Sequence, residues 1–325
     1  MPFLSFCIPT FQRKNLLVET LESIVSQIEE GVEIVISDNG SSDGTIEMMT
    51  ALQHKFPFII YKRFESSVPC GDNLLHVVEQ ARGEYCWLMT DDDKLEPGAL
   101  RKVLDFLKKH PGISGLSVNV QGYTKDMSQK KNIFYSHSVK EDRLFYSSHE
   151  FYSKLGAWIG FWSAQIVNKK KWEEALKDKR YLAFEGYHHL FIVAAIVHAA
   201  PYWGFMHQRL VGYRSDNESF SQEYGKLKRF FIDLEAYDGV GAAFFSSQAC
   251  RQVKSQVLRS LLFWQVIRAK VQGLNCLEIA EMFLKSYKKY KGSFFYWTIF
   301  VPLLVCPKII LKGVRPFFKL IRRFL

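Results

Sequence analysis

The chain has 325 residues, 48% of them hydrophobic and 15% aromatic, enough for one large core or two modest ones and too apolar for a disordered protein. It carries 43 Lys and Arg against 33 Asp and Glu, a formal net charge of +10. Ten of these bases lie in residues 285–325, which contain no acid, so the preceding residues are charge-balanced. This distribution argues against a nucleic-acid-binding core, whose basic face would spread through the domain.

Short apolar runs and helical patterns alternate through the first 120 residues. The apolar runs predict strands at residues 3–9, 33–37, 58–63, 84–89 and 113–120. The spacing between them predicts helices after Asn15, within SSDGTIEMMTALQ with a Ser or Asp cap, over 71–82, and from Glu96-Pro97 to Lys108. This order predicts an α/β fold with an open, mostly parallel sheet and helices on both faces.

The alternation weakens after residue 121. Residues 121–150 are polar and rich in loop-forming residues, while 157–167 (AWIGFWSAQIV) could form a strand or line a groove. Helices are expected over 187–200 and through most of 223–290. The sequence contains no internal repeat and no low-complexity linker, so we expect one α/β domain with a helical C-terminal extension.

The C-terminal segment combines apolar and basic residues. Residues 294–305 are apolar, but Pro302 interrupts them and they fall short of the roughly 20 residues that a spanning helix needs. The following KGVRPFFKLIRRFL predicts an amphipathic helix with Phe317, Leu320, Ile321 and Phe324 opposite Lys319, Arg322 and Arg323. We expect this tail to bind an anionic membrane surface, the alternative being a helix docked on the protein's own core.

The cysteines and the N-terminus indicate a compartment. The six cysteines form no CxxC pair, so neither a zinc finger nor a disulfide framework is expected. The first residues, MPFLSFCIPTFQRK, lack the basic and apolar regions and the cleavage site of a signal peptide. We therefore expect an intracellular protein in a reducing environment.

Three polar clusters directly follow predicted strands: Pro9–Arg13, Ser37–Gly40 and Thr90–Asp93. Ligands of open α/β sheets bind beyond the carboxyl ends of the strands, so these clusters are expected to meet in one crevice. Taken singly, the second could be only a turn and the third a solvated helix cap. Together they predict a binding site.

The consecutive carboxylates Asp91, Asp92 and Asp93 require a counter-charge. Such a cluster suits a hard divalent cation, Mg²⁺ or Mn²⁺, which commonly binds through one or two carboxylates plus the phosphates of a substrate. The sequence has neither a Walker lysine loop nor a GxGxxG motif. The expected ligand is therefore a nucleotide diphosphate lying over the first two strand ends.

Four ordered motifs resemble family 2 glycosyltransferases of the GT-A fold: SFCIPTFQRKNLLVETLESI, EIVISDNGSSDGT, ARGEYCWLMTDDDKLEPGAL and LVGYRSDNESF. The resemblance implies an open mixed sheet flanked by helices over residues 1–220, with a nucleotide-binding half (1–120) and an acceptor half (121–220), and a helical extension over 221–325. Within the family, SFCIPT, GEYCW, SAQIVNKKKW, YHHLF and SDNESF are most similar to the O-antigen abequosyltransferase type.

The resemblance implies a role for each matching residue. The nucleotide would be held by Pro9, Thr10, Arg13, Asp38, Asn39, Asp91 and Asp92, with Asp38 on the base and Asp91 on the ribose. The cation, Mn²⁺ or Mg²⁺, would be held by Asp92 and Asp93. Arg214 would either hold the diphosphate or simply close a loop.

The family's acidic pair in the second half is replaced here by FEGYHH, so the catalytic base stays open. Glu185, expected to be half-buried, or one of His188 and His189 could deprotonate the acceptor hydroxyl, or a histidine could be a core residue or add a metal ligand. Aromatic rings stack well on sugars, so the acceptor would be bound by Trp158, Phe161 and Trp162, whose alternative role is core packing.

The resemblance implies a hexosyltransferase-type enzyme that moves a sugar, such as a deoxyhexose, from a nucleotide-diphosphate donor. Its acceptor would be a polyprenyl-diphosphate-linked glycan of O-antigen-like synthesis, at the cytoplasmic face of a bacterial inner membrane. One alternative is a nucleotidyltransferase, although the expected glycine-rich loop is missing from IPTFQRK. Another is a non-catalytic glycan-binding protein, against which the intact Asp cluster argues.

Overall fold

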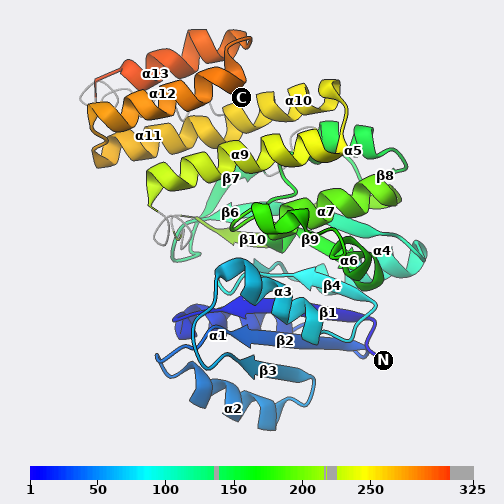
Figure 1. The fold of residues 1–325 in the computed structure, drawn as a ribbon. Coiled ribbons are helices and arrows are strands. Elements are labelled where there is room, and N and C mark those ends of the chain that lie inside the picture. Colours follow the sequence, from blue (N-terminus) through cyan, green and yellow to red (C-terminus); the bar gives the residue numbers. More distant parts are fainter. Residues whose placement is uncertain (135–138, 216, 218–224, 308–325) are drawn as a thin grey trace. The chain divides into compact units, whose positions relative to one another are not determined.

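The computed structural model describes residues 1–134, 139–215, 217 and 225–307, and the chain divides into two compact units, Met1–Asn217 and Glu218–Leu325 (Figure 1). Part of the LVGYRSDNESF motif, at residues 216 and 218–220, lies outside the described residues. The predicted amphipathic tail, residues 308–325, lies outside them as well.

The first unit is built on a mixed sheet in the order β3-β2-β1-β4-β9-β6-β10-β5, with β7 beside β6 and β8 beside β10. Parallel pairs join β1 to β2 and β4, β2 to β3, and β6 to β10, while β9 runs antiparallel between β4 and β6. The strands span Leu4–Thr10 (β1), Val32–Asp38 (β2), Ile59–Arg63 (β3), Tyr85–Leu88 (β4), Lys94–Leu95 (β5), Gly115–Tyr123 (β6), Lys130–Phe134 (β7), Arg143–Phe145 (β8), Gln165–Asn168 (β9) and Trp203–Arg214 (β10).

The five strands predicted in the first 120 residues are confirmed, each with ends shifted by no more than a few residues. Every residue of β1, β2 and β4 is buried, because helices cover both faces, and this explains their continuous apolar runs. The carboxyl ends of β1, β2 and β4 meet at one edge of the sheet, which brings the three polar clusters together.

The helices of this unit are α1 (Lys14–Val25), α2 (Thr45–Lys55), α3 (Cys70–Gln80), α4 (Ala99–Lys109), α5 (Ser148–Leu155), α6 (Lys169–Ala175) and α7 (His188–Ala199). Two predicted helix starts are wrong. α2 begins after Gly44 (φ +86°) without a Ser or Asp cap, and α4 begins after Gly98 (φ +73°) rather than at Glu96-Pro97. In both, glycine supplies a left-handed turn that other residues rarely adopt.

The expectation of loops over 121–150 is wrong in part, because this stretch contains the end of β6, all of β7 and β8, and the start of α5. The strand β10 was not predicted either. Register shifts between Met206 and Arg209 and between Arg209 and Val211 break its alternation of apolar and polar residues. The aromatic stretch 157–167 forms a short 3₁₀ turn, Trp162–Ala164, followed by β9.

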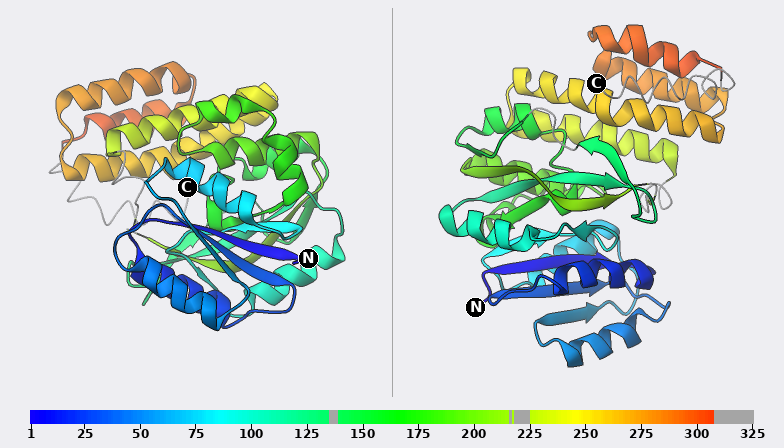
Figure 2. Two further views of the ribbon diagram at one scale, coloured as in Figure 1. Left: turned by 60° about the horizontal axis from the view of Figure 1, so that its bottom comes forward. Right: turned by 180° about the vertical axis from the view of Figure 1, so that it is seen from behind.

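The second unit is helical, as predicted. It contains α9 (Lys226–Phe244), α10 (Ser247–Val257), α11 (Phe263–Gln272), α12 (Cys276–Tyr290) and α13 (Val301–Val305), with π-helical segments at Leu258–Leu262 and Tyr296–Phe300. Helix α9 packs against α10, α11 and α12, and Figure 2 shows these helices from two sides. None of the helices among the described residues is both long enough and apolar enough to cross a bilayer.

Candidate active site

The residues Thr90–Asp93 follow β4 and form an acidic loop, which is bound to the end of β1. Asp91 is buried, and its carboxylate accepts hydrogen bonds from Thr10 Oγ1 at 2.8 Å and from Arg13 Nη1 at 3.1 Å. The same Arg13 nitrogen lies 3.2 Å from Asp92 Oδ2. The Arg13 guanidinium thus provides a counter-charge for Asp91 and Asp92, two of the three adjacent carboxylates.

Burial and mutual repulsion shift the protonation of this loop. Burial raises the pKa of Asp91 to about 6, Arg13 opposes the rise, and the Asp92 charge adds to it. Burial also raises the pKa of Asp93 to about 7, again with a contribution from Asp92. Full ionisation of the loop is therefore costly near neutral pH, and additional positive charge would favour it.

The third carboxylate, Asp93, faces the middle of the sheet. Its Oδ2 accepts a 2.7 Å hydrogen bond from Ser163 Oγ, and its Oδ1 accepts one of 3.0 Å from the Arg214 backbone N–H. Thr20 Oγ1 donates to the Asp93 carbonyl at 2.8 Å. Ser163 also lies 3.1 Å from Thr90 Oγ1, so it fixes both ends of the loop.

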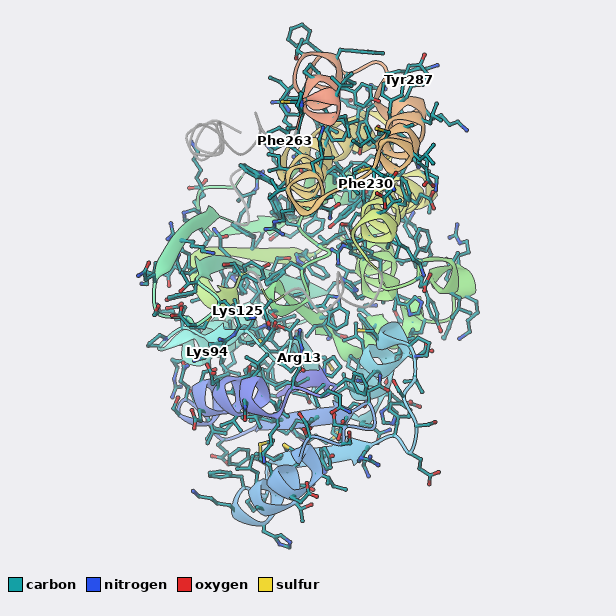
Figure 3. All side chains as sticks on the ribbon, turned by 90° about the vertical axis from the view of Figure 1, so that its left-hand side faces the viewer. Arg13, Lys94, Lys125, Phe230, Phe263 and Tyr287 are labelled. Carbon is teal, nitrogen blue, oxygen red and sulfur yellow. The ribbon has the colours of Figure 1, made fainter. Side chains whose placement is uncertain are left out.

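The Arg214 guanidinium holds the loop in place from the end of β10. Arg214 is buried and donates to the Asp92 carbonyl at 2.9 Å, to the Lys125 carbonyl at 2.7 Å and to Glu19 Oε2 at 2.7 Å. Lys94 Nζ contacts the same Glu19 oxygen at 2.6 Å, and Figure 3 labels Arg13, Lys94 and Lys125 around this region. The geometry favours loop closure over diphosphate binding for Arg214.

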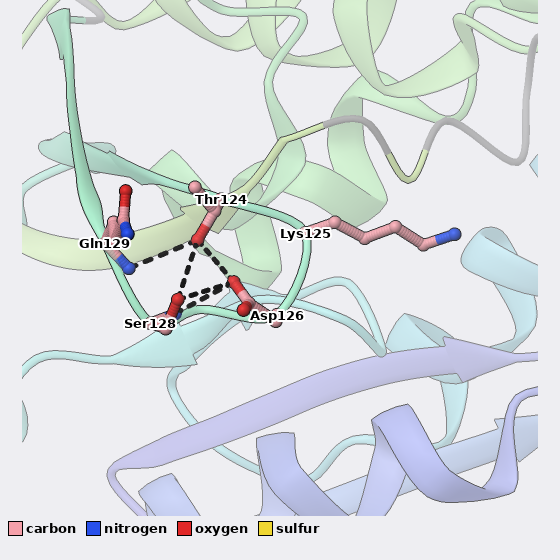
Figure 4. Close-up of a pocket in the computed structure, with 5 residues that line it drawn as sticks. All are labelled: Thr124, Lys125, Asp126, Ser128 and Gln129. Carbon is pink, nitrogen blue, oxygen red and sulfur yellow. Dashed lines mark hydrogen bonds between the residues drawn. The ribbon is translucent and has the colours of Figure 1, made fainter.

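An open pocket lies next to this region, in the turn between β6 and β7, lined by Thr124, Lys125, Asp126, Ser128 and Gln129 (Figure 4). Its polar side chains bond one another: Asp126 Oδ1 accepts from Thr124 Oγ1 at 2.5 Å and from Ser128 Oγ at 2.8 Å. The Lys125 side chain points away from this group. We interpret the pocket as part of a turn whose polar side chains already bond one another. The Lys125 carbonyl of this turn accepts a hydrogen bond from Arg214.

The second polar cluster, at the end of β2, is tied to β1. Asp38 is fully buried, and it accepts hydrogen bonds from the Ser41 backbone N–H at 2.9 Å and from Tyr61 O–H at 2.6 Å. Burial and the hydrogen bond to Asp38 raise the pKa of Tyr61 well above its usual range. The Asn39 backbone N–H donates to the Thr10 carbonyl at 2.9 Å, so the two strand ends are in contact.

Asn39 clamps the loop before α3. Its Nδ2 donates to the Val68 carbonyl at 2.8 Å, and its Oδ1 accepts from the Val68 N–H at 2.7 Å. Pro9 lies inside β1, opposite Ser37 of β2. Both residues therefore shape the edge of the site, since the Asn39 amide is engaged by backbone and the proline ring has no polar atom to offer a ligand.

Asn73 is a site residue that the sequence analysis missed. It lies in the first turn of α3, is 3% exposed, and donates from Nδ2 to the Thr10 carbonyl at 3.4 Å. Its Oδ1 accepts no hydrogen bond from the described part of the chain. A buried acceptor without a donor indicates a place for water or a ligand. Its signal in the sequence was a polar Asn among the first residues of the helix predicted over 71–82.

Glu19 and Ser163 were missed as well, because neither belongs to a polar cluster in the sequence. Glu19 lies within α1 and Ser163 in an aromatic stretch, and only the fold brings them to Arg214 and Asp93.

The three candidates for the base lie at the start of α7, where they differ in exposure. The expected half-burial of Glu185 is wrong, because its side chain is exposed. His188 and His189 are buried. The His188 ring lies so close to Gly71 that a Cβ atom added at residue 71 would be 2.4 Å from His188 Nδ1. Burial lowers the pKa of His188. His189 Nε2 lies 2.9 Å from the Gly160 carbonyl.

The aromatic segment connects α7 with the acidic loop. Trp158, Phe161 and Trp162 are all partly buried. The Trp162 ring meets His189 edge-on at 5.1 Å, and the next residue, Ser163, donates to Asp93. The Phe161 ring meets Tyr213 edge-on at 5.3 Å and packs against the core of the sheet.

The donor set fits a cation that is held partly by its substrate. Among the described residues, no group of three or more His, Cys, Asp or Glu side chains could hold an ion by itself. Both carboxylate oxygens of Asp91 and of Asp93 accept hydrogen bonds. Asp92 Oδ2 accepts from Arg13 and from Asn217 Nδ2, whereas no described residue donates to Oδ1 of this partly exposed side chain. One open carboxylate plus substrate phosphates is a common magnesium arrangement.

The sequence of this chain is similar to those of known proteins. The model of the family described as glycosyl transferase family 2 matches residues 5–174. The abequosyltransferase RfbV of Salmonella typhimurium is 32% identical over 255 residues, which cover 75% of each chain. The GalNAc(5)-diNAcBac-PP-undecaprenol beta-1,3-glucosyltransferase of Campylobacter jejuni is 35% identical over 107 residues, 32% of this chain and 34% of that protein.

Solved structures share the fold at low identity. TarS 1–349 of S. aureus in complex with UDP matches with a TM-score of 0.65 and 12% identity, covering 93% of this chain and 86% of that one. The mannosyltransferase PcManGT of Pyrobaculum calidifontis, in complex with GDP-Man and Mn²⁺, matches with a TM-score of 0.55 and 14% identity, covering 98% and 88%. These matches confirm the expected open mixed α/β sheet of the GT-A type.

Proposed function

This chain belongs to glycosyl transferase family 2, and from that premise we propose that it transfers a sugar from a nucleotide-diphosphate donor to a lipid-linked glycan in surface polysaccharide synthesis. The names of two relatives, an abequosyltransferase and a glucosyltransferase acting on a PP-undecaprenol glycan, support this substrate class. A deoxyhexose donor sugar and a polyprenyl-diphosphate acceptor are our finer assignments. The observation that carries the proposal is the Arg13 bridge to Asp91 and Asp92 at the strand edge.

We assign the donor nucleotide to the joined ends of β1 and β2. Asp38 would face the base, while Thr10 and Asp91 would face the ribose. The open acceptor Asn73 Oδ1 supports an additional contact with a donor hydroxyl or amine. Asn39 and Pro9 would act by shaping this edge rather than by bonding the ligand.

We assign the diphosphate to the outer side of the acidic loop. Asp92 would hold the Mn²⁺ or Mg²⁺ ion, with Asp93 behind it, and the bound ion would neutralise charge on the leaving diphosphate. Arg13, with 16% of its side chain exposed, is a cation of this site that phosphate oxygens can reach. Arg214, which is paired with Glu19, would keep the loop in position through its hydrogen bond to the Asp92 carbonyl.

In the transfer, the bond between the anomeric carbon and the diphosphate oxygen breaks, and a bond from that carbon to the acceptor oxygen forms. The acceptor hydroxyl must lose a proton to a base. Glu185 is exposed and accessible to an entering acceptor, whereas His189 lies beside Trp162, near the loop. We keep Glu185, His188 and His189 as candidates, with Trp158, Phe161 and Trp162 on the acceptor side.

The acceptor class also implies a location. A lipid-linked glycan would require the enzyme at the cytoplasmic face of the bacterial inner membrane, bound peripherally. The ten bases of residues 285–325, with no acid among them, support attraction to anionic lipids. Deleting residues 308–325 is expected to weaken vesicle binding most at low salt, where exposed charges act most strongly.

The donor assignment is tested by a thermal-shift panel of UDP, GDP, CDP and dTDP, each with and without Mn²⁺. We expect one nucleotide to raise the melting temperature only when Mn²⁺ is present. The corresponding nucleotide sugar should then release its nucleotide diphosphate when a lipid-linked glycan is added. Stabilisation by none of the nucleotides would contradict the proposal, and binding without turnover would favour the non-catalytic alternative.

A further inference from the structure

Large apolar side chains are concentrated on the surface of one part of the second unit. Among the described residues, twelve large hydrophobic side chains are exposed, and seven of them fall within residues 277–305: Leu277, Leu284, Tyr287, Phe294, Trp297, Ile299 and Val305. Single exposed apolar residues are ordinary, but a contiguous group marks an interaction site.

Helix α12 has an apolar stripe on its outer face. Leu277, Leu284 and Tyr287 are spaced seven and three residues apart, which puts them on one side of the helix. Leu277 is 82% exposed and Leu284 is 60% exposed. The opposite side of α12, with Met282 and Tyr290, is buried. The helix is therefore packed on one face and still carries apolar residues on the other.

The stripe continues onto the segment that follows α12. The Tyr287 and Trp297 rings meet edge-on with their centroids 6.0 Å apart, and Trp297 Nε1 donates to the Lys291 carbonyl at 2.7 Å, which fixes the indole. Phe294 is 84% exposed and Val305 is 70% exposed. Figure 3 labels Tyr287 at the margin of this unit. We call Leu284, Tyr287, Phe294, Trp297 and Val305 the α12–α13 patch.

Lysines lie beside part of this patch. Lys288 and Lys291 are exposed, and Lys291 Nζ lies 5.9 Å from the centre of the Tyr287 ring. Lys285 pairs with Glu281, and Lys289 pairs with Asp238. Glu281 thus offsets Lys285 beside Leu284, but the sequence from residue 285 to residue 325 contains no acid, so the part of the rim next to Tyr287, with Lys288 and Lys291, carries net positive charge.

We propose that the α12–α13 patch docks on an anionic membrane, with its aromatic and aliphatic side chains in the interfacial region and its lysines at the headgroups. The other occupants are disfavoured by charge: the charged residues of the segment 308–325 are all bases, and the patch of a second copy would bring its own lysines. Anionic headgroups provide the opposite charge, and Trp and Tyr are enriched at membrane interfaces. This surface shares no residue with the sugar-transfer site.

The test is co-sedimentation of the full chain with vesicles of equal parts phosphatidylcholine and phosphatidylglycerol, compared with phosphatidylcholine alone. Phe294→Ser with Val305→Ser removes two highly exposed side chains, so the fold should persist. We expect the affinity of this variant for anionic vesicles to be lower by roughly tenfold or more, because the two apolar side chains that would be buried in the membrane interface are removed. Tyr146→Ser with Leu182→Ser, also exposed but in the first unit, is the matched control and should bind like the wild type.

A second measurement does not depend on those substitutions. Lipids brominated near the headgroup end of their chains should quench part of the tryptophan fluorescence, and Trp297→Phe should remove that quenching. Wild-type vesicle binding by Phe294→Ser with Val305→Ser would overturn the proposal. Unchanged quenching in Trp297→Phe would overturn it as well. If Phe294→Ser with Val305→Ser instead converted the protein to a smaller oligomer, the occupant of the patch would be a second copy of the chain, and the proposal would be wrong. Stronger vesicle binding after deletion of residues 308–325 would identify the tail as the occupant.

Discussion

Arg13 Nη1 lies 3.1 Å from Asp91 Oδ1, although 78 residues separate them in the sequence. The contact joins the loop after β1 to the loop after β4 and compensates a carboxylate that burial would otherwise keep protonated. It holds the acidic loop against the end of β1, and it leaves Arg13, with 16% of its side chain exposed, where a diphosphate could reach it.

Replacing Arg13 should therefore affect both stability and binding. In Arg13→Gln, Asp91 and Asp92 lose their shared counter-charge, and we expect a loss of about 1 to 3 kcal/mol in the free energy of unfolding at neutral pH. Denaturant unfolding at neutral and mildly acidic pH measures this, and the loss should shrink in acid, where Asp91 is protonated. Arg63→Gln, at a partly exposed residue 3.7 Å from Asp38, is the control and should show a smaller effect. A loss that does not depend on pH would contradict this role of Arg13.

The acidic loop should also make stability depend on pH. The pKa of Asp91 is raised to about 6 and that of Asp93 to about 7, both above the value of about 4 in an unfolded chain. Between about pH 4 and 7 the folded protein therefore binds more protons than the unfolded chain, so its stability falls as the pH rises through that window. The fall is on the order of 4 kcal/mol for Asp93 taken alone.

This pH dependence is measured by unfolding the protein in denaturant across that range. Asp93→Asn should flatten the slope at its upper end, because the amide does not titrate. A slope of the same size in Asp93→Asn would show that other groups are responsible.

Ser163 should act as a positioning residue. Ser163→Ala leaves the buried Asp93 Oδ2 without its 2.7 Å hydrogen-bond donor, which should cost about 1 to 3 kcal/mol in the free energy of unfolding. It should also lower kcat by a larger factor than it changes the KM for the nucleotide sugar. Ser163→Thr keeps the hydroxyl and should restore much of the turnover. Equal kcat in the alanine variant and in the wild type would show that the orientation of Asp93 does not limit the reaction.

The identity of the base is open to a direct comparison. Glu185→Gln should keep nucleotide binding and lose sugar transfer if Glu185 takes the acceptor proton, because the exposed amide cannot accept it. His189→Asn is measured in parallel for nucleotide binding and turnover. Normal turnover in Glu185→Gln would move the base to a histidine, and His188 or His189 would then set the pH profile.

Much of the first unit could be predicted from the sequence because its strands are buried on both faces. Such strands are uniform apolar runs, and the polar residues that end them stand out. The second half of the sheet was harder to predict. The strand β10 contains register shifts and polar residues, and β9 lies in an aromatic stretch that also fits a groove. In these strands the pairing partner, rather than a local pattern, determines the conformation.

The candidate site divides in the same way. Thr10, Arg13, Asp91 and Asp92 meet as expected, since the ends of neighbouring parallel strands share one edge, whereas Asp93 is bonded to Ser163 and Arg214. Glu19, Asn73 and Ser163 were not found, because their relation to the loop depends on helix packing and on an antiparallel strand. The role of Arg214 depends on the same packing, which uses its guanidinium to close the loop.

Joint binding of a nucleotide diphosphate and a divalent cation by the acidic loop underlies every role assigned above, and isothermal titration calorimetry measures it directly. The titrant is the nucleotide diphosphate that gives the largest thermal shift, added with Mn²⁺ or with a chelator to the wild type, Asp92→Asn and Asp93→Ala. We predict that the wild type binds only with Mn²⁺, and that both variants stay folded and bind at least tenfold more weakly, a difference of about 1.4 kcal/mol or more. Equal affinity in chelator, or unchanged binding by Asp92→Asn, would contradict the proposed site.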